Sequence, residues 1–172
     1  VFRCGFVAVV GRPNVGKSTL INAMMGRKVS IVTAKPQTTR HRILAVLTGD
    51  RDQIVFVDTP GLHRNAVRAM NRLMNRVAVN ALADADLALF VVEATRWTEE
   101  DDDVLKRIKA SNVPCIALLN KIDTLHPKER LLAAIDDLSQ RHDFVEIILG
   151  QVHHLRLGLF DPRQPRELDA AL

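Results

Sequence analysis

Short apolar runs alternate along this chain with segments in which apolar residues recur every three or four positions. The strands that this pattern predicts are residues 6–10, 43–48, 53–57, 87–92, 115–119 and 144–149. The helices that it predicts are residues 17–25, 67–81, about 98–110 and about 127–140. Because strands that alternate with helices usually pair in parallel, we expect an α/β fold with a mainly parallel sheet.

Two breaks in the pattern set the expected organisation. Gly49 and Asp50 stand between the second and third predicted strands, where they indicate a hairpin and therefore one antiparallel strand. After residue 149 the alternation stops, and only a short helix from Pro165 is indicated. We therefore expect a domain over residues 1–149 and an atypical tail over residues 150–172.

A phosphate-binding loop follows the first predicted strand. The segment Gly11-Arg-Pro-Asn-Val-Gly-Lys-Ser18 matches G-x-x-x-x-G-K-[ST] between a strand and a helix. The two glycines let backbone N–H groups point at phosphate oxygens, and the helix adds its positive end. Lys17 is expected to act on the β and γ phosphates, and Ser18 to bind Mg²⁺. The expected nucleotide-binding residues here are Gly11, Arg12, Pro13, Asn14, Val15, Gly16, Lys17, Ser18 and Thr19.

A second motif, Asp58-Thr59-Pro60-Gly61, comes at the end of the predicted strand 53–57. Ligands gather at the carboxyl ends of strands in open α/β sheets, so Asp58 is expected to hold Mg²⁺ through a water. Gly61 can bring a backbone N–H to the γ phosphate and let the next loop move when that phosphate leaves. A plain β-turn would have the same sequence, but the phosphate loop favours a nucleotide-binding role for all four residues.

The third motif is Asn120-Lys121-Ile122-Asp123, the N-K-x-D element of GTP-binding proteins, directly after a predicted strand. The Asp123 carboxylate can accept hydrogen bonds from the ring N–H and the amine of guanine. Adenine presents a different pattern and would leave polar groups unpaired, which is costly. Asn120 and Lys121 are expected to brace the phosphate loop and cover the base. GTP and GDP are therefore the expected nucleotides.

Thr38 and Thr39, in the predicted loop 27–42, are candidates for sensing the γ phosphate and Mg²⁺, since threonine offers a hydroxyl and a backbone N–H. We prefer Thr39. The expected Mg²⁺ ligands are Ser18, Thr39 and Asp58, and the residues expected to act in catalysis are Lys17, Thr39 and Gly61.

The motifs resemble those of the Era family, Ras-like GTPases linked to assembly of the small ribosomal subunit. The segments that resemble this family in particular, and not GTPases in general, are residues 36–42, 57–63, 71–75 and 90–97. The resemblance extends from Gly5 to about Ile148. It implies a P-loop NTPase fold, a three-layer αβα sandwich with a mainly parallel six-stranded sheet and one antiparallel edge strand. It also implies a conformational switch that hydrolyses GTP to GDP and phosphate, with residues 27–42 and about 61–70 as the moving parts.

Two residues, Leu62 and Asn14, bear on how GTP would be hydrolysed. Ras-type enzymes orient the attacking water with a glutamine after the second motif, whereas this chain has Leu62 there, so slow intrinsic turnover is expected. GTPases with asparagine at the place of Asn14 often bind K⁺ beside the phosphates, which implies a K⁺ site at Asn14. The alternative is that Asn14 only supports the turn.

The chain departs from the family after Ile148. A Ser-Ala element that contacts the guanine oxygen should fall at about Gly150 to Val152, followed by a helix over the sheet, and neither pattern is present. A shift of reading frame or a spliced tail would produce such a change. The family's RNA-binding KH domain does not follow within these residues, so contact with 16S rRNA or the small subunit would depend on Lys28, Lys35, Arg40 and Arg42.

Composition changes this picture little. A chain that is 47% hydrophobic and 26% charged is expected to be ordered, and a net charge of +4 suits phosphate partners as well as an ordinary solvated surface. Cys4 and Cys115 lie in apolar runs, so we expect two buried free thiols and a reducing compartment. No apolar run approaches the ~18 residues of a membrane span, and a cytoplasmic protein is expected. A monomer is also expected, and peripheral contact to the inner membrane face is a further implication of the family.

Three functions remain open on the sequence. The first is a GTPase switch. The second is a GTP-binding interaction module whose hydrolysis is impaired because the tail lacks the last guanine-contact motif. The third is a P-loop ATPase, which Asp123 disfavours.

Overall fold

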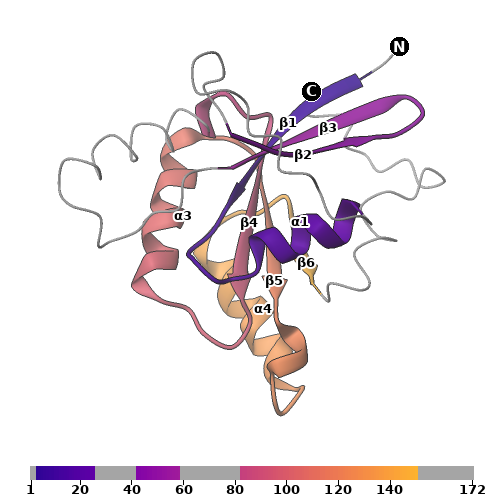
Figure 1. Ribbon diagram of the computed structural model, residues 1–172. Helices are drawn as coiled ribbons and strands as arrows, with labels where there is room; N and C mark the ends of the chain where they lie inside the picture. The colour runs from indigo at the N-terminus through magenta and orange to yellow at the C-terminus, as the bar shows by residue number, and fades with distance from the viewer. Residues whose placement is uncertain (1–2, 26–41, 59–81, 151–172) are drawn as a thin grey trace.

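The computed structural model describes residues 3–25, 42–58 and 82–150, with helices on both sides of a central sheet (Figure 1). Its strands are β1 (Arg3–Val10), β2 (Arg42–Thr48), β3 (Asp52–Asp58), β4 (Leu87–Glu93), β5 (Cys115–Asn120) and β6 (Glu146–Leu149). Its helices are α1 (Lys17–Met25), α3 (Glu99–Ser111) and α4 (Arg130–Arg141), with a single 3-10 turn, η1 (Ile122–Thr124).

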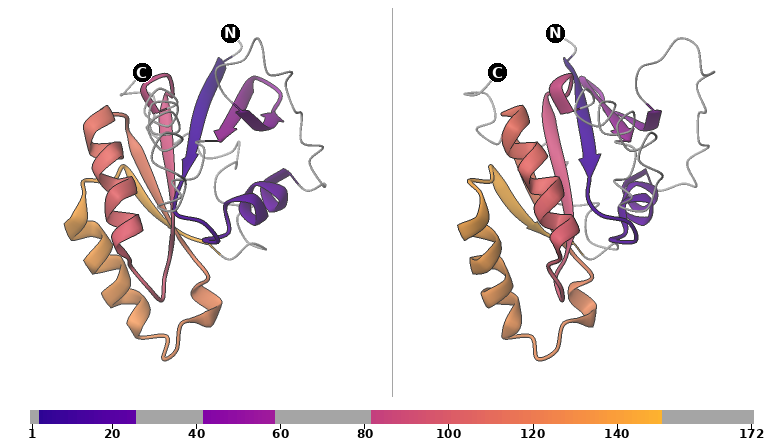
Figure 2. Two further views of the ribbon diagram at one scale, coloured as in Figure 1. Left: turned by 60° about the vertical axis from the view of Figure 1, so that its left-hand side comes forward. Right: turned by 90° about the vertical axis from the view of Figure 1, so that its left-hand side faces the viewer.

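The six strands form one sheet in the order β2-β3-β1-β4-β5-β6. Strand β2 is antiparallel to β3 at the edge, and every other neighbouring pair is parallel. Helix α1 covers one face of the sheet, and α3 and α4 cover the other (Figure 2). The predicted αβα sandwich, with six strands and one antiparallel edge strand, is confirmed.

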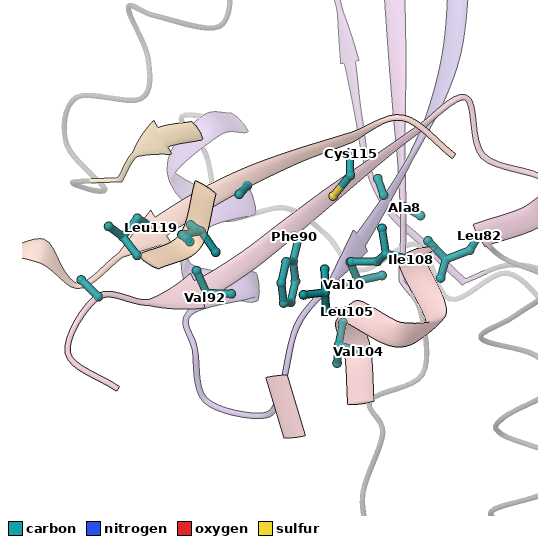
Figure 3. Packing of buried hydrophobic residues seen from close by; sticks show 14 of the residues in the cluster. Ala8, Val10, Leu82, Phe90, Val92, Val104, Leu105, Ile108, Cys115 and Leu119 are labelled. Atoms are coloured by element: carbon teal, nitrogen blue, oxygen red, sulfur yellow. The ribbon is translucent and has the colours of Figure 1, made fainter. Parts of the chain in front are cut away.

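Two hydrophobic clusters hold the layers together, one on each face. The cluster under α3 and α4 is centred on Phe90, which is fully buried, and includes Val10 and Ile108 (Figure 3). The cluster under α1 includes Leu20 and Leu118. Because the central strands are covered on both faces, they are apolar at nearly every position, which is why their sequences are continuous apolar runs.

Trp97 links the loop after β4 to the outer helices. Its ring meets Phe90 edge-on with the centroids 6.0 Å apart, and its Nε1 donates to Asp102 in α3 at 2.8 Å. The guanidinium of Arg141, at the end of α4, lies 4.2 Å over the ring. A tryptophan at a polar loop edge therefore has a packing role, with its ring partly buried and its N–H paired.

Some expected boundaries were wrong, for physical reasons. Strand β1 begins at Arg3 instead of Phe6, because Arg3 pairs with Asp52 of β3. Helix α4 begins at Arg130 and not at Pro127, since Arg130 N–H bonds the Pro127 carbonyl oxygen in a tighter turn before the helix. Strand β6 begins at Glu146, two residues later than expected.

The expectation of two buried cysteines was half wrong. Cys115 at the start of β5 is buried, whereas Cys4 is exposed. Cys4 lies in the first half of β1, where the side chains are exposed or half-buried, and full burial begins only at Val7. An apolar sequence context identified the strand but not the part of it that the helices cover.

Several expectations fall outside the described residues. They concern the helix 67–81, residues 27–41 of the predicted loop, and the tail after Gly150. Within residues 3–25, 42–58 and 82–150, no helix has the length and apolar character needed to cross a membrane.

Candidate nucleotide-binding site

The ends of four neighbouring strands meet at one edge of the sheet. Gly11 follows β1, Asp58 ends β3, Glu93 ends β4 and Asn120 ends β5. These strands are parallel neighbours in the order β3-β1-β4-β5, so all four ends point the same way. After β1 the chain adds strands first on one side and then on the other. Such a switch point is where open α/β sheets bind ligands.

The loop after β1 is curved by residues with positive φ. Gly11 has φ 151°, Asn14 has φ 64° and Gly16 has φ 99°. A side chain at Gly11 would run into the Val91 carbonyl oxygen, and one at Gly16 would run into the amide of Asn120. Only glycine fits these two places, so the backbone forms a tight cradle of the kind that holds phosphate.

Lys17, the first residue of α1, folds its side chain over this cradle. Its Nζ donates to the carbonyl oxygens of Gly11 at 2.7 Å and Arg12 at 2.8 Å. Ser18 and Thr19 follow in the first turn of α1, where both are exposed and no acidic residue is present. The amine and the helix N-terminus therefore place positive charge at the mouth of the loop, which suits a phosphate chain.

The loop after β5 is tied directly to the phosphate loop. Asn120 is only 4% exposed, and its Nδ2 donates to the Val15 carbonyl oxygen at 2.7 Å. Lys121 adopts a left-handed conformation with φ 58°, which turns the chain into η1. Asp123 lies in η1 with an exposed side chain. An exposed carboxylate in a loop that is tied to the phosphate cradle can accept hydrogen bonds from a base with two adjacent N–H donors.

The Arg12 side chain contacts two carboxylates of the protein. Its Nη2 lies 2.7 Å from Glu93 Oε2, and its Nε lies 3.1 Å from Asp101 Oδ2. The Arg12 side chain is 11% exposed, so the backbone and not the guanidinium is available to a phosphate at this position. Lys121 Nζ also reaches Glu93 Oε2, at 3.3 Å.

Glu93 and Asp101 were missed by the sequence analysis. Burial opposes the charged form of Glu93, but hydrogen bonds from Arg12, Thr95 and Lys121 outweigh it and hold the pKa of Glu93 below its ordinary value. Asp101 is fully buried, and it was not among the predicted site residues. The sequence signal that could have indicated Glu93 as a site residue is its position at the end of a strand, which it shares with Asp58 and Asn120.

The remaining predicted site residues lie outside the described part of the chain. These are Thr38, Thr39, Thr59, Pro60 and Gly61, together with the side chain of Asp58, whose backbone ends β3. Among the described residues, no group of three or more His, Cys, Asp and Glu is placed to hold a metal ion. The Ser18 hydroxyl, exposed at the start of α1, is an oxygen ligand of the type that Mg²⁺ takes.

Comparison with known proteins agrees with this geometry. A family described as 50S ribosome-binding GTPase matches residues 6–121. GTPase Era of Actinobacillus pleuropneumoniae serotype 3 (strain JL03) is 53% identical over 145 residues, which are 84% of this chain and 48% of that protein. GTPase Era of Pasteurella multocida (strain Pm70) is 50% identical over 145 residues, with 84% and 47% covered.

Solved structures give the same result. Era in complex with MgGDPNP and a segment of 16S ribosomal RNA has a TM-score of 0.73 and 38% identity, covering 89% of this chain and 52% of that chain. An Aquifex aeolicus Era variant bound to GDP·AlF4⁻ has a TM-score of 0.68 and 36% identity, covering 87% and 52%. The chain thus spans about half the length of these relatives. It belongs to the 50S ribosome-binding GTPase family, and its G domain is of the Era type.

Proposed function

We propose that this chain binds GTP and GDP with Mg²⁺ and hydrolyses GTP to GDP and phosphate as a conformational switch. The observation that carries the proposal is the hydrogen bond from Asn120 to Val15, which joins the phosphate cradle to the loop of Asp123. One ligand with phosphates at one end and a guanine at the other would span both loops. The Era relatives solved with MgGDPNP and with GDP·AlF4⁻ support this assignment.

Different residues of the site would contact the phosphates and the Mg²⁺ ion. Lys17 and the N–H groups of the loop 11–18 would stabilise negative charge on the phosphates, since they are fixed before the ligand arrives. Ser18, Asp58 and Thr39 would hold Mg²⁺, which supplies neutralising charge at the β and γ oxygens. Gly61 would contact the γ phosphate through its backbone.

Slow turnover follows from Leu62, whose side chain cannot orient an attacking water. We expect an intrinsic rate on the order of 10⁻⁴ to 10⁻² per second, the range of Ras-like enzymes without an activator. A K⁺ ion beside Asn14 would raise this rate. The alternative is that Asn14 only supports the turn. Its φ of 64° fits this role as well as it fits a K⁺ site, because asparagine tolerates this conformation. Turnover in K⁺ compared with Na⁺ separates the two, and equal rates would remove the K⁺ site.

The deciding experiment measures GTP and ATP binding to the purified chain, together with phosphate release in Mg²⁺. Selective GTP binding with phosphate release supports the proposal. GTP binding without release would favour the interaction module, and a preference for ATP would favour the ATPase.

The variant Asp123→Asn tests recognition of the guanine base, because it keeps the shape of the side chain but replaces one hydrogen-bond acceptor by a donor. It should weaken GDP binding strongly without unfolding the chain.

A ribosomal role is the second part of the proposal. An Era relative was solved with a segment of 16S ribosomal RNA, so we infer that the protein carrying this G domain acts in assembly of the small ribosomal subunit in the cytoplasm. We infer a monomer, and the resemblance to the family further implies peripheral membrane contact. Co-sedimentation with small ribosomal subunits in the presence of GDPNP or GDP tests the ribosomal role, and absence of binding in both states would reject it for this chain.

A further inference from the structure

The carboxylate of Glu93 lies between the two loops that would hold the two ends of a nucleotide. One oxygen, Oε2, is 2.7 Å from Nη2 of Arg12 in the phosphate loop and 3.3 Å from Nζ of Lys121 in the base loop. The other oxygen, Oε1, accepts from the Thr95 hydroxyl at 3.0 Å. The Glu93 side chain is 19% exposed, so solvent screens these charges less than at an open surface.

Arg12 is anchored on its other side as well. Its Nε pairs with Asp101 Oδ2, which also accepts from the backbone N–H and the hydroxyl of Thr98, both at 2.9 Å. Asp101 is fully buried at the start of α3. Arg12 would therefore keep its place if Glu93 lost its charge.

Lys121 depends on Glu93 more than Arg12 does. In the part of the chain that the structure describes, Glu93 is the carboxylate that pairs with Lys121. Lys121 has the left-handed backbone that directs the chain into η1, and Asp123 follows only two residues later. Whatever fixes Lys121 therefore also limits the positions that the Asp123 carboxylate can take.

We propose that Glu93 is a positioning residue for guanine recognition. By pairing with Arg12 and Lys121 through one oxygen, it holds the base loop in register with the phosphate loop. Asp123 then meets the ring N–H and amine of guanine while the phosphates occupy the cradle. This inference rests on the proposed function, because it assigns a role within the same site.

The test compares the binding of GDP and inosine diphosphate to the unaltered chain and to Glu93→Gln. Inosine lacks the exocyclic amine of guanine, so the ratio of the two dissociation constants reports how well Asp123 is placed. We expect Glu93→Gln to weaken GDP binding about twofold to fivefold, the effect of losing one ion pair, and to weaken inosine diphosphate binding less. Asp136→Asn, which removes one exposed carboxylate of α4, is the control and should leave both constants unchanged.

The preference ratio separates positioning from a merely structural role. A folded Glu93→Gln with the same preference for GDP as the unaltered chain would overturn the inference, even if its stability fell. If Glu93→Gln does not fold, Glu93→Asp is used instead, because its shorter side chain keeps the charge but cannot reach both cations. Its preference for GDP should also fall, and an unchanged preference would overturn the inference. An unaltered chain that binds no guanine nucleotide would instead overturn the proposed function, and this inference with it.

Discussion

Asn120 and Val15 are 105 positions apart in sequence, yet the Nδ2 of Asn120 lies 2.7 Å from the Val15 carbonyl oxygen. The bond crosses from the end of β5 to the middle of the phosphate loop, and both residues are buried. The carbonyl oxygen of Asn120 in turn accepts from the N–H of Ala94 after β4, at 2.9 Å. The Asn120 side chain thus joins the loop after β5 to the phosphate loop, and the Asn120 backbone joins it to the loop after β4.

Replacing Asn120 by alanine should therefore lower both stability and nucleotide affinity. The substitution leaves the Val15 carbonyl oxygen without its amide donor, and an unpaired buried polar group costs about 1–3 kcal/mol. The free energy of unfolding, measured by urea denaturation without nucleotide, should fall by that amount. Gln140→Ala, at an exposed site on α4, should change it very little. Equal stability of the Asn120 and Gln140 variants would contradict this account of the loop.

Gly16→Ala should reduce nucleotide binding far more than Gly5→Ala. An alanine Cβ at Gly16 would press on the Asn120 amide from a backbone with φ 99°, so the cradle must shift. An alanine Cβ at Gly5 in β1 would meet Asp86 Oδ2 at 3.6 Å, which is ordinary contact. Fluorescence titration with a labelled GDP compares the two variants. Similar affinities would mean that the tight curve of the loop is not needed for binding.

Elements with a strong local pattern could be predicted from the sequence. Helix α1 was expected at the residues where it occurs, because a glycine-rich loop precedes it and apolar residues mark its buried face. The central strands were expected because strands buried on both faces are apolar throughout. At the site, the same local information predicts nucleotide contacts for Lys17, Asn120 and Asp123, whose motifs are short and contiguous.

Contacts between distant residues could not be predicted in this way. Arg12 meets Glu93 and Asp101 across 81 and 89 positions, and no spacing in the sequence indicates such pairs. Asp101 stands in a run of five acidic residues, 99–103. The sequence alone does not show which of these side chains is buried or which cation it pairs with. Only the fold places the N-terminus of α3 against the phosphate loop.

Asp101→Asn should destabilise the chain more than Asp103→Asn. Asp101 is fully buried, pairs with Arg12 and accepts two hydrogen bonds from Thr98, so the amide loses a charge-assisted partner and part of the helix cap. We expect a loss of about 1–3 kcal/mol in the free energy of unfolding. Asp103 pairs at the surface with Lys106, and such pairs contribute about 1 kcal/mol or less. Thermal unfolding of both variants at one pH compares them directly, and equal melting temperatures would contradict the prediction.

The two cysteines should differ in reactivity. Burial raises the pKa of the Cys115 thiol to about 12, so only about one molecule in 10⁴ carries the reactive thiolate at pH 8. Cys4 is exposed and should be alkylated by iodoacetamide within the native chain. Mass spectrometry should find one label per native chain, at Cys4, and two after unfolding in guanidinium. Rapid native labelling of Cys115 would show that β5 opens or is less buried than described.

The stability difference between the unaltered chain and Glu93→Gln should depend on pH. Burial alone would raise the pKa of Glu93, but hydrogen bonds from Arg12, Thr95 and Lys121 lower it below the ordinary value of 4.5. The unfolded chain then binds more protons than the folded one in this window, so the contribution of Glu93 to stability grows as the pH rises. It is complete well above pH 4.5 and is lost as the pH falls through the lowered pKa of the folded state.

Glutamine cannot titrate, and the other acidic groups are common to both chains, so subtracting the two unfolding curves isolates the carboxylate. The difference in unfolding free energy between the two chains should shrink as the pH is lowered from neutral to below 4.5. Asp136→Asn serves as the reference, since its carboxylate is exposed and its stability should follow that of the unaltered chain. A difference for Glu93→Gln that stays constant over the same range would mean that the charge of Glu93 contributes nothing to stability through its pairs with Arg12 and Lys121.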